Sequence, residues 1–115
     1  MIHFQREVRE GVLLLSIEGN LIGEEIGSGI LDMANNAIQE NINECIIDIT
    51  KVKYINSSGI GVLITLLTKF RNQDGELFIV NPSEHVKKLL VITKLMAIFK
   101  VVNTIEEALN QLKES

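Results

Sequence analysis

The chain contains no tryptophan, and its other aromatic residues are Tyr54 and four phenylalanines. Proteins that bind single-stranded nucleic acid usually stack bases on aromatic side chains and attract phosphates with clustered basic residues. Here the basic residues are scattered, Lys87–Lys88 being the densest pair, and the formal net charge is −4. A net negative charge opposes attraction to a phosphate backbone. We therefore expect no nucleic-acid partner.

Cysteine is present once, as Cys45 within an apolar run, and so the chain has no internal disulfide. This pattern is typical of a core side chain in a reducing compartment. His3 and His85 are far apart in the sequence and show no metal-ligand spacing with Cys45. Neither a metal nor another cofactor is therefore expected.

Long hydrophobic runs are also missing. No stretch approaches the roughly 20 apolar residues of a membrane span, and residues 1–10 alternate charged and apolar side chains instead of forming a signal peptide. Together with the single cysteine, this predicts a cytoplasmic protein that does not insert directly into a membrane.

The size and composition favour one compact domain. The chain has 115 residues, of which 46% are hydrophobic and 23% charged, a balance that allows a buried core. We expect a single domain over residues 1–115.

Short apolar runs predict strands at residues 3–8, 12–18, 45–49, 76–80 and 99–102, with a turn at Glu10–Gly11. Apolar residues three or four positions apart predict helices at 26–38, 60–70, 83–93 and 104–112. Ser83 is the candidate N-cap of the third helix, and Thr104 with Glu107 forms a candidate capping box. The pattern predicts an α/β fold with a mixed sheet of about four to five strands and about four helices packed against it.

Small polar residues occur at Asn56, Ser57, Ser58 and Gly59, where a predicted strand passes into a predicted helix. The start of a helix presents free N–H groups at its positive end, so an anion such as a phosphate on Ser57 is favoured there. The plainer interpretation is that Ser57 and Ser58 only cap the helix. Local chemistry alone leaves both interpretations open and favours the plainer one.

The run from Ile46 to Thr50, followed by Val52 to Leu63, resembles the central signature of STAS domains. The similarity extends from Gly19 to the Glu106–Glu107–Ala108–Leu109 segment, which is similar to the start of the last helix in that family. The resemblance therefore covers nearly the whole chain and is more specific than two serines.

This resemblance implies an anti-sigma factor antagonist and not an enzyme. Such a protein binds an anti-sigma factor that is also a GHKL-type serine kinase, and thereby releases a sigma factor or another partner. The resemblance implies that the kinase phosphorylates Ser57, which blocks binding, and that a Ser/Thr phosphatase resets the switch. Partner binding is implied for the segment Asn56, Ser57, Ser58, Gly59 and Ile60, to which we add Asp48.

Two residues depart from the family pattern. Asn56 stands where antagonists usually carry Asp before the acceptor serine, and Ile22 stands where an acidic residue is common. These departures keep a second hypothesis open, in which the chain is a scaffold subunit of a transport or signalling complex that is not phosphorylated.

Asp48, at the expected end of the central strand, also suggests the phosphoacceptor of a receiver domain. A receiver needs a pair of acids after an earlier strand to hold a divalent metal, and only Glu18 is found there. We interpret Asp48 instead as capping or orienting the Asn56–Ser57 loop. A hydrolase is disfavoured because no Gly-x-Ser-x-Gly motif surrounds Ser57.

The apolar run from Leu95 to Phe99 has two interpretations. Core packing explains most of it, but some of these side chains could form an exposed patch for a partner. The sequence does not decide between them.

Overall fold

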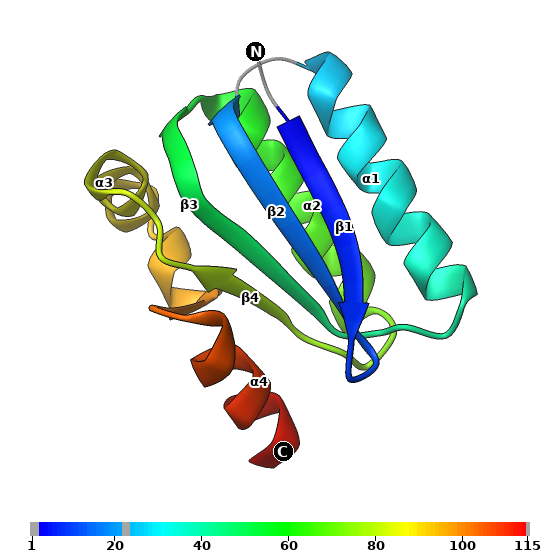
Figure 1. The fold of residues 1–115 in the computed structure, drawn as a ribbon. Helices are drawn as coiled ribbons and strands as arrows, with labels where there is room; N and C mark the ends of the chain where they lie inside the picture. The colour runs from blue at the N-terminus through cyan, green and yellow to red at the C-terminus, as the bar shows by residue number, and fades with distance from the viewer. Residues whose placement is uncertain (1–2, 22–23, 115) are drawn as a thin grey trace.

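The computed structural model describes the backbone of residues 3–21 and 24–114 and the side chains of residues 3–20 and 29–114. The elements follow the order β1 (His3–Arg9), β2 (Val12–Leu21), α1 (Glu24–Gln39), β3 (Cys45–Ile55), α2 (Ser57–Arg71), β4 (Leu77–Val80), α3 (Glu84–Ile92), a 3₁₀-helix η1 (Leu95–Ala97), β5 (Lys100–Val102) and α4 (Ile105–Glu114) (Figure 1). This confirms the predicted mixed sheet and the helices packed against it.

The strands form one sheet in the order β1-β2-β3-β4-β5. β1 and β2 pair antiparallel through a tight turn in which Glu10 and Gly11 have φ values of 54° and 78°. Positive φ at both positions matches the twist of a two-residue hairpin. The other neighbouring pairs are parallel, and each of their connections contains a helix.

Alternating side chains on the strands supply two separate cores. On β2, Leu13, Leu15 and Ile17 point into the larger core, which also contains buried residues of α1, α2 and α3. Val12 and Leu14 point to the opposite face, where they pack with Ala108 and Leu109 of α4. The molecule is therefore layered, with α4 on one face of the sheet and the other helices on the opposite face (Figure 1).

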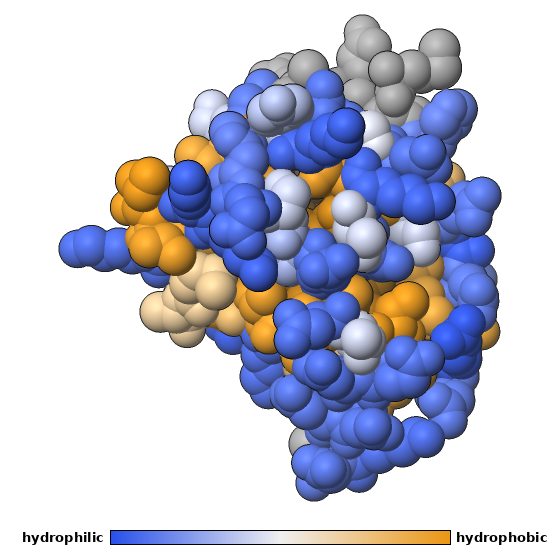
Figure 2. All heavy atoms as spheres, turned by 60° about the vertical axis from the view of Figure 1, so that its left-hand side comes forward, coloured by the Kyte–Doolittle hydropathy of each residue, from blue (hydrophilic) through white to orange (hydrophobic). Residues whose placement is uncertain are grey.

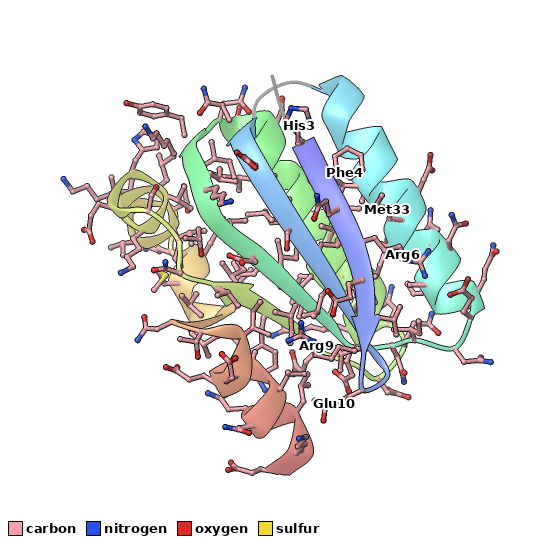
Figure 3. All side chains as sticks on the ribbon, in the orientation of Figure 1. His3, Phe4, Arg6, Arg9, Glu10 and Met33 are labelled. Atoms are coloured by element: carbon pink, nitrogen blue, oxygen red, sulfur yellow. The ribbon has the colours of Figure 1, made fainter. Side chains whose placement is uncertain are left out.

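The edge strand β1 is held against α1. Phe4 points from β1 toward α1, where Met33 also lies (Figure 3), and both pack against the larger core. A Cβ added at Gly29 would lie 2.9 Å from Cζ of Phe4, so this glycine allows the ring to approach the helix. Nearby, Arg6 forms an exposed ion pair with Glu40 at 2.9 Å.

The predicted end of the central strand at Ile49 is wrong, because β3 continues to Ile55 through residues predicted to be a link. Val52 and Ile55 are buried, whereas Lys51 and Lys53 on either side of Val52 are exposed. Register shifts in the pairing with β2 allow both strands to continue after the strict alternation ends. This extension carries the start of α2 beyond the end of the shorter strand β4.

The structure also divides the run from Leu95 to Phe99. Phe99 is buried in the larger core and Leu95 packs against it, whereas Met96 and Ile98 are exposed. Core packing is therefore confirmed for Phe99 and Leu95, and a docking role for the exposed Met96 and Ile98 stays a prediction.

Candidate functional site

Helix α2 begins at Ser57, and its N-cap is Asn56. Asn56 has an extended backbone, and its side-chain Oδ1 accepts a hydrogen bond from the Gly59 N–H at 2.9 Å. Its carbonyl accepts the first helical hydrogen bond, from the Ile60 N–H, also at 2.9 Å. The interpretation that Ser57 and Ser58 cap this helix is therefore wrong, because Asn56 performs that task.

Ser57 occupies the first helical position and is exposed. Among the described residues, its hydroxyl has no hydrogen-bond partner, and neither do the backbone N–H groups of Ser57 and Ser58. Unpaired N–H groups at the first turn carry the positive end of the helix dipole. A negative charge on the Ser57 Oγ would therefore be stabilised by groups that are already in place.

The residues after Ser57 differ in burial around the first turn of α2. Ser58 and Ile60 are half-buried, and Gly59 is buried, whereas Gly61 is again exposed. A Cβ added at Gly61 would have no neighbour within 4 Å, so the packing of the described chain does not require a glycine there. The exposed residues at the start of α2 are therefore small, and another molecule can approach the helix backbone closely.

The start of α3 lies beside this site. The Ser83 hydroxyl donates to the Lys53 carbonyl at 3.1 Å and accepts from the Val86 N–H at 3.3 Å, which confirms Ser83 as an N-cap. Tyr54 and His85 form an edge-to-face pair with ring centroids 5.0 Å apart. Both side chains are exposed, so the site has an aromatic neighbour contributed by two elements. Sequence reasoning missed this pair, since nothing local links residues 31 positions apart.

Asp48 lies within β3 and does not end the strand. Its Oδ1 accepts hydrogen bonds from the backbone N–H and the hydroxyl of Thr50, at 3.0 Å and 2.6 Å, and not from the Asn56–Ser57 loop. Ile55, the last residue of β3, lies seven positions after Asp48, a length on the order of 20 Å along the strand. The interpretation that Asp48 caps or orients the loop is therefore wrong, and a role for it in partner binding stays a prediction.

Asp48 instead lines an open cavity of about 330 Å³ on the sheet. The cavity is bordered by side chains of β1, β2 and β3, namely His3, Gln5, Ser16, Ile17, Glu18, Asp48, Thr50 and Lys51. His3 therefore lines the same cavity as Asp48, from the other side of β2, while His85 is paired with Tyr54.

The structure offers neither a metal site nor a reactive thiol among the side chains that it describes. Among the side chains that the structure describes, no three His, Cys, Asp or Glu groups come together in a way that would hold a metal ion. Burial raises the pKa of the Cys45 thiol, which keeps it protonated and unreactive. In the same part of the chain, no helix has the length and apolar character that crossing a bilayer requires.

The model of the STAS domain family matches residues 3–108. The chain belongs to this family. The matched residues include the whole of α2 and the capped loop before it, so the site described above lies inside the STAS domain. Ile22, the second departure from the family pattern, lies outside the described residues.

Relatives and solved structures agree with this assignment. A Thermotoga neapolitana protein, named as a candidate anti-sigma factor antagonist, is 30% identical over 76 residues, which are 66% of this chain and 67% of that protein. The crystal structure of a Thermotoga maritima protein with the same description has a TM-score of 0.83 at 24% identity, over 96% of this STAS chain and 94% of that one.

The anti-sigma factor antagonist SpoIIAA, a Bacillus protein, has been solved in two forms. The unphosphorylated form has a TM-score of 0.77 at 20% identity, over 96% of this chain and 98% of that one. The phosphorylated form has a TM-score of 0.75 at 21% identity, over 96% and 99%. At these identities the structures show that the fold is shared.

Proposed function

We propose that this STAS protein is a phosphoregulated anti-sigma factor antagonist. In this proposal it binds a cytoplasmic anti-sigma factor that is also a GHKL-type serine kinase, and releases the sigma factor or other partner held there. The observation that carries the proposal is Ser57, an exposed and unbonded hydroxyl at the first position of a helix that is already capped by Asn56. The names of the relatives and the two forms of SpoIIAA support the same role.

The docking surface in this proposal consists of Asn56, Ser57, Ser58 and the exposed side of the helix they open. Ser58 and Ile60 are half-buried and Gly59 is buried, so no large side chain projects from this end of α2. A kinase domain can therefore reach the Ser57 hydroxyl without unfolding the first turn. The Gly59 N–H donates to the Asn56 cap, and a contact between Gly59 and the partner stays a prediction.

Phosphorylation would act on this surface in a simple way. The Ser57 Oγ attacks the γ-phosphorus of ATP, its proton passes to the kinase, and ADP leaves. The phosphate adds about −1.5 to −2 charges and accepts hydrogen bonds from the free N–H groups at the helix start. The fold is then retained, while charge and bulk at the centre of the docking surface oppose binding. Hydrolysis by a Ser/Thr phosphatase would restore the hydroxyl.

Asn56 is compatible with this switch. Asn and Asp are about equally good N-caps, so the change from the usual Asp keeps the geometry of Ser57. The neutral amide removes a carboxylate that would repel a phosphate on the next residue. The departure therefore affects recognition by the kinase more than it affects the shape of the site.

The decisive experiment incubates the protein with ATP and each anti-sigma factor kinase encoded in its source genome, then locates phosphate by mass spectrometry. We expect one phosphate at Ser57, lost in Ser57→Ala and retained in the neighbouring control Ser58→Ala. Ser57→Asp should weaken the complex by about tenfold or more, because it places a charge in the interface.

Failure of all these kinases to modify wild type, under conditions that modify a known antagonist, would contradict the phosphoswitch. Stable binding of the unmodified chain within a transport complex would then support the scaffold hypothesis.

A further inference from the structure

Apolar side chains are exposed on one side of the molecule, along the end of α3 and the 3₁₀-helix that follows. Six large apolar side chains are exposed in the described chain, and four of them fall between residues 91 and 98. We call this group the α3 strip, and it consists of Val91, Ile92, Met96 and Ile98. Figure 2 shows apolar side chains gathered at the left margin of its view, on the side where α3 lies in Figure 1.

The α3 strip is prominent and not required by the fold. Val91 and Ile92 are 61% and 74% exposed, and neither belongs to a core cluster. The same helix is anchored by Val86 and Leu90, both fully buried. Folding therefore does not explain why two adjacent large apolar residues face solvent.

The charge around the α3 strip is opposite to that of the whole chain. Residues 84–98 contain three lysines against one glutamate, a formal charge of +2, whereas the chain carries −4. Lys87 is 3.9 Å from Glu84, but Lys88 and Lys94 have no ion-pair partner within the part of the chain that the structure describes. The apolar strip is thus bordered by basic groups that are available to an acidic surface.

Helix α3, whose end carries Val91 and Ile92 of the α3 strip, is joined at its start to the segment before Ser57. At the start of α3, Ser83 bonds to Lys53 and His85 packs on Tyr54, two residues before Asn56. At its far end the strip contacts the opposite end of α2, where Arg71, about 21 Å along the helix from Ser57, donates to the Ile98 carbonyl at 2.9 Å. Helix α3 has 9 residues and is therefore about 13 Å long. The strip and the Ser57 site consequently lie within the reach of one protein interface.

We propose that the α3 strip is the second part of the docking surface, and that its occupant is an apolar surface bordered by acidic side chains on the anti-sigma factor kinase. This inference rests on the proposed function and identifies the chemistry of the partner. A central apolar contact with a complementary charged border is the usual composition of a specific interface.

Two other occupants fit the observations less well. A second copy that paired through the same strip would bring Lys88 and Lys94 of both copies together, and like charges oppose such a contact. A lipid bilayer would require apolar side chains that project outward as a group. Met96 and Ile98 are only 37% and 38% exposed, which suits packing against side chains rather than insertion.

The test measures the dissociation constant of the complex with the purified anti-sigma factor kinase that modifies Ser57, by calorimetry without ATP. Ile92→Asp should weaken binding by about tenfold or more, and Lys88→Glu by about threefold or more. Each has a matched control outside the strip. Val8→Asp places the same charge at an exposed valine of β1, and Lys113→Glu reverses an exposed lysine of α4, so both controls should stay within about twofold.

The outcomes separate this inference from the proposed function. Wild type that binds the kinase with no loss in Ile92→Asp overturns the role of the α3 strip and leaves the Ser57 switch standing. Wild type that neither binds nor is modified overturns both. Binding of vesicles of phosphatidylglycerol and phosphatidylcholine, or self-association in sedimentation, that disappears in Ile92→Asp while kinase affinity is unchanged assigns the strip to a membrane or to a second copy. A thermal melt of each variant checks that α3 remains folded.

Discussion

The Oδ1 atom of Asn56 accepts a hydrogen bond from the backbone N–H of Gly59 over 2.9 Å, and this contact sets the start of α2. Asn56, the residue before the candidate phosphoacceptor Ser57, therefore has a structural role as the N-cap of α2. Without this bond, one more N–H group at the first turn would lack a protein partner.

Replacement of this cap should destabilise the protein by a predictable amount. We expect Asn56→Ala to lower the free energy of unfolding by about 1 kcal/mol, and Asn56→Asp to keep it, because a carboxylate also accepts the Gly59 N–H. Urea denaturation measures the difference. Asn72→Ala, at the exposed C-cap of the same helix, is the matched control. Equal stability of Asn56→Ala and the control would show that the cap contributes nothing.

Gly75, after the end of α2, is required for a different reason. Its N–H donates to the Phe70 carbonyl at 2.9 Å, and a Cβ added to it would overlap the backbone carbonyl oxygen of Asn43. Backbone atoms on both sides cannot move apart without disturbing the starts of β3 and β4. We expect Gly75→Ala to lower the free energy of unfolding by about 3 kcal/mol, measured by urea denaturation. A loss within experimental error would mean that the two segments separate easily.

The local features of this fold could be predicted from the sequence, because they depend on residues close together in the chain. The Thr104 hydroxyl accepts from the Glu107 N–H at 3.1 Å, as the capping box predicts, although the Glu107 carboxylate accepts from Asn103 instead of Thr104. The hairpin turn at Glu10–Gly11 is likewise a local property.

Features that depend on distant partners could not be predicted. The extension of β3 past Ile49 requires pairing with β2 and a register shift. The exposed Lys51 and Lys53 interrupt the apolar run by which the strand is recognised in the sequence. The position of Asp48 within that strand follows from the same extension. The choice of Asn56 over Ser57 as cap is local, but the two residue types cap helices about equally well, so sequence alone does not select one.

Cys45 provides a test of core rigidity. The thiol is fully buried on β3, and burial raises its pKa because the thiolate would lose its hydration. A raised pKa in the folded state means that stability is complete below the ordinary thiol pKa of about 8.5 and falls as pH rises above it.

We therefore expect Cys45 to react with a thiol reagent at pH 8 only after unfolding, and the free energy of unfolding to fall between pH 8.5 and pH 10. Cys45→Ala should remove this thiol-dependent part of the fall. Rapid labelling of the native protein would show that this core opens readily.

A substitution at Gly61 should have opposite effects on the stability of the fold and on the affinity for a partner. It is exposed on α2, one turn after Ser57, and a side chain there would meet no neighbour within 4 Å. An interior helical glycine is less favourable than alanine by about 1 kcal/mol, so Gly61→Ala should raise the free energy of unfolding by about that amount. The same methyl group would project into the proposed docking surface, and we expect it to weaken kinase binding by about tenfold. Asn110→Ala, at an exposed position of α4 on the opposite face of the sheet, is the control for the binding measurement. A variant that is more stable and still binds with wild-type affinity would place the partner away from this turn of α2.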